Sequence, residues 1–178
     1  MTYCLAACVD AGLVFLSDSR TNAGIDQLGV HSKMHPFTDL DGRFFTLLSA
    51  GNLATTQAVV ARLRRDIREN ADVNLGNVKR IRDAADYVGA VNRAMVEKYG
   101  SDDAEESFTP TADFIFGGQI GDDAHALFQV YPQGNYFSPT ALVPFLQIGE
   151  KKYGKPILDR IIQMRSKLET VALCGLVS

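Results

Sequence analysis

This chain of 178 residues has a small net charge, few cysteines and no long apolar runs. The formal net charge is −3, which gives no electrostatic case for binding nucleic acid or an anionic membrane. Uncharged apolar runs, such as residues 13–16, are far shorter than the roughly 20 residues that a membrane-spanning helix needs. The start of the chain lacks a basic segment followed by a long apolar one, so no signal peptide is expected.

Cysteine is limited to Cys4, Cys8 and Cys174, an odd number without a CxxC pair. This pattern argues against a disulfide framework and indicates reduced thiols in the cytoplasm. The simplest role for all three is as small apolar side chains in a core. No internal repeat or low-complexity segment divides the chain, and its length suffices for a sizeable core. We therefore expect a single domain over residues 1–178.

Strand-like and helix-like patterns occur in separate runs along the chain. Apolar segments bounded by turn residues predict strands at 3–9, 13–17, 28–34, 43–48, 112–116, 124–131, 136–137 and 145–148. Helical spacing of apolar residues predicts helices over 54–70, over 83–98 and after Pro156. Pro36 is expected to interrupt the strand pattern that precedes it. The tail at 171–178 is interpreted as one strand or an unrelated ending. Segregated strands and helices are typical of α+β proteins, which pack most simply as sheet on sheet with helices outside.

The first two strands are expected to form a hairpin around a three-residue loop, Asp10-Ala11-Gly12. In that register Val9 faces Leu13, and Asp18 lies diagonally from Thr2 on the same face. A shift of one residue would send Asp18 to the opposite face. Taken alone, a carboxylate at this position is more typical of a strand end.

Thr2 follows the initiator residue Met1, which is usually removed when a small residue comes next. Its removal would leave Thr2 with both a hydroxyl and a free amine. The hydroxyl can attack a carbonyl, and the amine, with an ordinary pKa of about 8, can accept the proton. The simpler alternative is a processed terminus without a chemical role.

Four motifs in the first third of the chain together resemble the start of a proteasome β-type subunit: MTYC at 1–4, LSDSRTNAG at 16–24, HSKMH at 31–35 and LSAGNLATTQ at 48–57. GNYFSPT at 134–140 and IGEKKYGKPILDR at 148–160 are similar to the bacterial Anbu branch of these N-terminal nucleophile hydrolases. The resemblance covers most of the chain. It implies a four-layer α/β/β/α sandwich of α+β class, no metal or organic cofactor, and self-assembly into a ring or an open helical turn.

The resemblance also implies roles for four residues. Thr2 would be the nucleophile of a threonine peptidase or amide hydrolase that acts on a peptide or protein through an acyl-enzyme. Lys33 would favour the neutral amine and the ionised hydroxyl, and Asp18 would hold Lys33 in place. Gly51 would contribute a backbone N–H to the oxyanion site, since a glycine allows close approach of the substrate carbonyl. The sequence identifies no regulatory partner.

The resemblance is incomplete near the C-terminus. Proteasome-type subunits continue past the helix near Pro156 with another helix and further strands, which carry an aspartate and a serine that support the threonine. The segment MRS at 164–166 is only faintly similar to that region, and Asp159 belongs to the preceding helix. Completeness of the sandwich and activity of the site therefore stay open. The alternative function is a catalytically inactive structural or assembly subunit of the same fold.

Three other motifs are weaker. Residues 149–155 fit GxxxxGK, but Pro156 stands where a phosphate-binding loop needs Ser or Thr. His31 and His35 are four residues apart, which suits zinc only on a helix, whereas this stretch has a strand and turn pattern. Cleavage before Cys4 would produce a cysteine-led amidase, although Thr2 is itself a good start.

Overall fold

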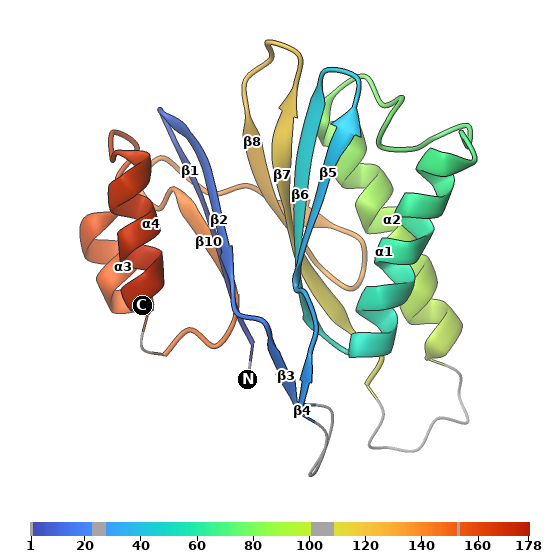
Figure 1. The fold of residues 1–178 in the computed structure, drawn as a ribbon, viewed down its shortest axis with the longest axis horizontal. Coiled ribbons are helices and arrows are strands. Elements are labelled where there is room, and N and C mark those ends of the chain that lie inside the picture. The colour runs from blue at the N-terminus through green and yellow to red at the C-terminus, as the bar shows by residue number, and fades with distance from the viewer. Residues whose placement is uncertain (1, 23–27, 101–108, 153) are drawn as a thin grey trace.

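The computed structural model describes residues 2–22, 28–100, 109–152 and 154–178, which form a mixed α/β fold with two main antiparallel sheets and four helices (Figure 1). The smaller sheet has the strand order β10-β1-β2 and consists of β1 (Tyr3–Val9), β2 (Gly12–Ser17) and β10 (Phe145–Gly149). A short hairpin of β3 (Arg20–Asn22) and β4 (Leu28–Val30) extends from one end of the molecule.

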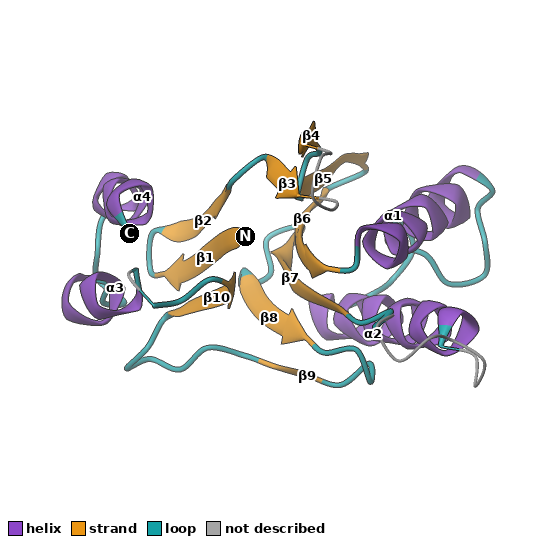
Figure 2. Ribbon diagram, turned by 90° about the horizontal axis from the view of Figure 1, so that it is seen from below, coloured by secondary structure: helices purple, strands orange, loops and turns teal. Residues whose placement is uncertain are grey.

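The larger sheet has the strand order β5-β6-β7-β8-β9, with every neighbouring pair antiparallel. Its strands are β5 (Met34–Leu40), β6 (Arg43–Gly51), β7 (Ala112–Ile120), β8 (Ala126–Val130) and β9 (Tyr136–Phe137). The two main sheets lie face to face (Figures 1 and 2).

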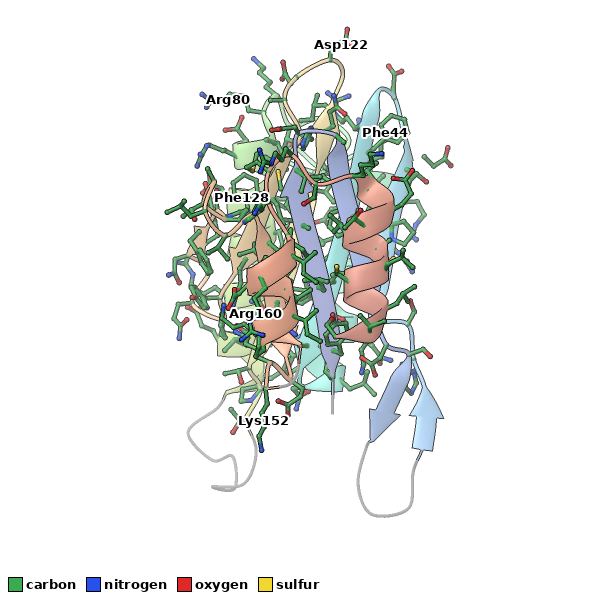
Figure 3. The ribbon with its side chains drawn as sticks, turned by 90° about the vertical axis from the view of Figure 1, so that its left-hand side faces the viewer. Phe44, Arg80, Asp122, Phe128, Lys152 and Arg160 are labelled. Atoms are coloured by element: carbon green, nitrogen blue, oxygen red, sulfur yellow. The ribbon has the colours of Figure 1, made fainter. Side chains whose placement is uncertain are left out.

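Each sheet carries two helices on its outer face (Figure 2). The larger sheet is covered by α1 (Leu53–Arg68) and α2 (Ile81–Tyr99), and the smaller one by α3 (Lys155–Ile161) and α4 (Leu168–Val177). Figure 3 views the smaller sheet through α3 and α4, which stand side by side in front of it. None of the described helices is both long and apolar enough to cross a bilayer.

Three apolar clusters separate these layers, because alternate residues of a strand face opposite sides of a sheet. In β1, Leu5 and Ala7 pack toward α3 and α4, whereas Cys4 and Ala6 pack between the sheets. The strands of the larger sheet alternate in the same way. Phe45, Leu47, Phe114 and Phe116 face α1 and α2, while Leu48 and Ile115 face the smaller sheet.

The register of the first hairpin differs from the prediction by one residue. Gly12 pairs with Val9, so the turn contains only Asp10 and Ala11, and the predicted three-residue loop is wrong. Gly12 can begin the strand because its φ of +137° is open to glycine and strained for other residues.

Two further predictions need correction. The predicted strand at 28–34 is divided, because β4 ends at Val30 and Met34 begins β5 in the larger sheet. Pro36 does not interrupt β5, since β5 is the edge strand and needs no N–H donor on its open side.

The tail is helical rather than extended. Gly175 of α4 lies so close to the smaller sheet that a Cβ there would be 2.6 Å from Leu16 Cδ1. This close packing on the sheet stabilises a helix whose apolar residues show little one-sided pattern.

Candidate active site

An ion pair between Lys33 and Asp18 forms the centre of the site. Lys33 lies just before β5 and is almost completely buried, and its Nζ donates to both carboxylate oxygens of Asp18, at 2.8 Å and 2.7 Å. The backbone N–H of Tyr3 donates to Asp18 Oδ1 at 2.8 Å, and the N–H of Asp18 donates to the carbonyl of Tyr3 at 3.0 Å. Asp18 thus ties the start of β1 to the residue that precedes β5.

Asp18 reaches this position although the predicted register is wrong. It lies opposite Tyr3, directly after the last residue of β2. Because Asp18 is outside the regular strand, the alternation of faces does not dictate where its side chain points.

Thr2 lies immediately before β1, and its carbonyl accepts a hydrogen bond from the N–H of Glu150 at 2.7 Å. Gly149 lies against it, with a φ of +84°. A Cβ on Gly149 would come within 2.1 Å of the Thr2 carbonyl oxygen. Gly149 therefore fixes the place of Thr2, a role that neither the GxxxxGK pattern nor the motif at 148–160 predicted.

Gly51 is the last residue of β6, directly before Asn52, the N-cap of α1. Its φ is +110°, and a Cβ there would be 2.5 Å from the carbonyl oxygen of Thr111. Both the backbone conformation and this contact require glycine.

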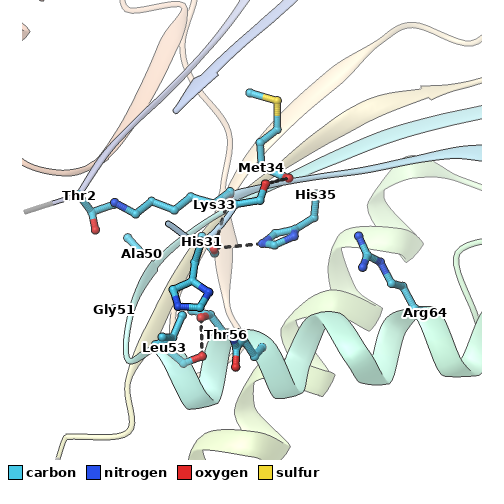
Figure 4. A pocket seen from close by; sticks show the side chains of 13 residues that line it. Thr2, His31, Lys33, Met34, His35, Ala50, Gly51, Leu53, Thr56 and Arg64 are labelled. Carbon is cyan, nitrogen blue, oxygen red and sulfur yellow. Dashed lines mark hydrogen bonds between the residues drawn. The ribbon is translucent and has the colours of Figure 1, made fainter. Parts of the chain in front are cut away.

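Thr2, Lys33 and Gly51 all line one cavity of about 280 Å³ (Figure 4). Lys33 extends toward Thr2 in this view. Of the four residues that the sequence singled out, three share the cavity, and the fourth, Asp18, binds Lys33 from outside the lining. The predicted removal of Met1 concerns a residue outside the described part of the chain.

The far part of the cavity is polar and was not predicted. It is lined by His35 of β5, Ser49 of β6 and Arg64 of α1, with His35 Nε2 3.4 Å from Ser49 Oγ. Burial lowers the pKa of His35, and the positive charge of Arg64 lowers it further. Arg64 was not singled out from the sequence, because helical periodicity alone does not distinguish it from the neighbouring arginines of α1.

Cys4 is unsuited to nucleophilic attack. It lies inside β1 and is fully buried, and burial together with the Asp18 charge raises the pKa of its thiol to about 12. Because the thiolate is the reactive form, the geometry argues against a cysteine-led site.

The residues of the other motifs have structural roles or lie apart from one another. Lys155 of the GxxxxGK stretch forms an ion pair with Asp159 at 2.8 Å in α3, and Gly149 supports Thr2. In the described ranges, no group of three or more His, Cys, Asp or Glu residues is arranged to hold a metal ion.

Comparison with solved structures decides the family. Anbu (ancestral beta-subunit) from Yersinia bercovieri is 39% identical with a TM-score of 0.91, and the match covers 99% of this chain and 72% of that one. The chain belongs to the Anbu family. Anbu is related to the proteasome, so the resemblance that the sequence motifs indicated is confirmed.

Two further Anbu structures are similar. The helical assembly of the Anbu complex from Pseudomonas aeruginosa is 41% identical at a TM-score of 0.92, with 99% of this chain and 72% of that chain covered. A (Gly-1) mutant of Anbu from Hyphomicrobium sp. strain MC1 is 39% identical at a TM-score of 0.89, with 99% and 73% covered. Neither the family models nor the curated proteins that were searched gave a match.

Proposed function

We propose that this Anbu chain is a threonine peptidase or amide hydrolase of the N-terminal nucleophile type, with Thr2 as nucleophile after removal of Met1. One observation carries the proposal: Thr2, Gly51 and the buried ammonium of Lys33 line the same cavity, and Asp18 binds that ammonium through both oxygens. The four-layer sandwich of this enzyme class, formed as one domain over residues 1–178, is part of the same proposal.

The chemistry needs only groups of the chain and water. The Thr2 hydroxyl attacks the substrate carbonyl while its α-amine accepts the hydroxyl proton. The ammonium of Lys33 favours the alkoxide electrostatically, and a backbone N–H at Gly51 stabilises the oxyanion. The α-ammonium then protonates the leaving amine, which departs and leaves an ester on Thr2. Water attacks this ester with the same amine as base, releasing the acid and restoring the hydroxyl. Such a cycle uses no metal or organic cofactor.

Homo-oligomerisation belongs to this proposal as well. The Anbu complex from Pseudomonas aeruginosa forms a helical assembly, and the high identity supports a related assembly here, as a ring or an open helical turn. The three cysteines, all unpaired in the structure, are consistent with a reducing compartment such as the cytoplasm.

The test is covalent labelling by a peptide epoxyketone, which reacts with a hydroxyl and an amine of the same residue. We expect labelling of the assembled protein, none in Thr2→Ala and a strong loss of labelling rate in Lys33→Ala. Lys155→Ala serves as a matched control, because Lys155 also pairs with an aspartate but lies outside the cavity. Absence of labelling in a folded, assembled sample would favour the inactive assembly subunit instead.

A further inference from the structure

The cavity beside Thr2 has an excess of positive charge. Among the described residues that line it are Lys33, Arg64, His31 and His35, and none of its described lining residues is Asp or Glu. Asp18 compensates Lys33 by direct ion pairing. The guanidinium of Arg64 is therefore the fixed charge that remains to act on a bound group.

Arg64 faces the cavity because of its position on α1. Leu53, Gln57 and Arg64 recur at spacings of four and seven residues, which places them on one face of a helix, and all three line the cavity. Figure 4 shows Thr2 at one end of the cavity and Arg64 at the other, with His35 between them.

The neighbouring arginines of α1 have different surroundings. Arg62 pairs with Asp66 at 2.5 Å, and Arg65 lies 3.7 Å from the same carboxylate. Throughout the part of the chain that the structure describes, no carboxylate lies within ion-pair distance of Arg64. Arg64 thus presents donors to the cavity without a countercharge from any of the described residues.

Two other features favour a negative charge at this place. The N-terminal turn of α1 contributes Leu53 and Thr56 to the lining, and this helix, which is described in full, has no acidic residue in its first turn. The N-cap, Asn52, accepts from the N–H of Thr55 but is neutral, so no negative side-chain charge in this first turn offsets the positive end of the helix dipole. The imidazole of His35 and the hydroxyl of Ser49 add polar groups between the two ends of the cavity.

We propose that this cavity accepts an acidic side chain, glutamate or aspartate, of the residue whose carbonyl Thr2 attacks, and that Arg64 is the specificity-determining residue. The inference rests on the proposed function, since it names the substrate class of the same site. A volume of about 280 Å³ suits one side chain rather than a larger ligand. A guanidinium can bind a carboxylate through two charge-assisted hydrogen bonds. A neutral amide side chain, as in glutamine, lacks the negative charge and binds the guanidinium more weakly.

The test compares two capped peptides, acetyl-Ala-Ala-Glu-amide and acetyl-Ala-Ala-Gln-amide, which differ in one charge and hardly in shape. Their dissociation constants are measured by NMR titration against the full chain carrying Thr2→Ala, in which no acyl-enzyme can form. We expect the glutamate peptide to bind about tenfold more tightly, the low end of the range for hydrogen bonds to charged groups. Adding Arg64→Gln should reduce the ratio to near one, while adding Arg68→Gln should leave it unchanged. Arg68 is an exposed arginine of the same helix that does not line the cavity.

Equal dissociation constants for the two peptides, a preference unaffected by Arg64→Gln, or no binding of either peptide up to about 10 mM would overturn this inference. The peptide titration does not depend on hydrolysis. A glutamate preference in a protein that resists epoxyketone labelling would reject the proposed function alone, and labelling without the preference would reject the acidic specificity alone.

Discussion

The Nζ of Lys33 lies within 2.8 Å of both carboxylate oxygens of Asp18, although Lys33 is only 6% exposed. A buried ammonium is costly unless a countercharge binds it. This pair therefore links stability to the position of the proposed site.

Asp18→Asn should destabilise the fold, because the ammonium of Lys33 would remain buried without its countercharge. The Asp18 side chain is 30% exposed, so we expect a loss of about 1–3 kcal/mol in the free energy of unfolding, below the range for fully buried pairs. Urea unfolding measures it. Asp159→Asn is the matched control, since its ion pair with Lys155 is exposed on both sides and should change stability by under about 0.5 kcal/mol. Similar losses in both variants would contradict the prediction.

Gly149→Ala should displace Thr2, because the added Cβ would meet the Thr2 carbonyl at 2.1 Å. We expect a stability loss of more than about 2 kcal/mol and a fall in epoxyketone labelling, from strain and contact together. Gly121→Ala is the control that measures the effect of backbone strain alone. Gly121 also has a positive φ, +52°, but no atom lies within 4 Å of the position that its Cβ would take. If both variants lost about 1 kcal/mol and labelled normally, the positioning role of Gly149 would be wrong.

Tyr87→Phe should weaken the contact between α1 and α2. Tyr87 Oη donates to Asp66 Oδ2 at 2.7 Å, and Arg62 Nε donates to the same oxygen at 2.5 Å. Removing one donor from a buried carboxylate should cost about 1–3 kcal/mol at neutral pH, as measured by denaturant unfolding.

The effect of Tyr87→Phe should depend on pH. Burial raises the pKa of Asp66, but the hydrogen bonds from Tyr87 and Arg62 outweigh it, so the pKa is lower than in the unfolded chain. This carboxylate therefore stabilises the fold above its unfolded pKa of about 3.9, and that contribution is lost as pH falls through the folded value. The difference between wild type and Tyr87→Phe should shrink as pH falls below about 4. A difference that stays constant would contradict this origin.

Arg64→Gln should raise the pKa of His35, because the charge of Arg64 is one of the two causes of its depression. The value should stay below the ordinary value of about 6.5, since burial remains. An NMR titration of the imidazole protons reports it directly. Arg68→Gln should leave this titration unchanged, and an equal shift in both variants would show that Arg64 has no special proximity to His35.

Strands and helices could be predicted well from apolar periodicity, which is local information. The pairing of Val9 with Gly12 could not, because a glycine with positive φ can belong either to a turn or to a strand. The interruption predicted at Pro36 is wrong because the sequence does not reveal which strand forms an edge of the sheet. The tail became α4 through its packing on β2, a tertiary effect that outweighs local pattern.

The same limit applies to the site. Thr2, Lys33 and Gly51 could be selected from family motifs, and the structure brings them to one cavity. Gly149 is far from Thr2 in sequence and reaches it only because β10 pairs with β1, and Arg64 reaches the cavity only because α1 packs on the larger sheet.

The most direct test of the central claim is mass spectrometry of the N-terminal peptide after reaction of the assembled protein with a peptide epoxyketone. We predict that this peptide begins at Thr2 and carries the probe on that residue. A terminal peptide that retains Met1 and carries no probe, from protein shown to be folded and assembled, would contradict the account.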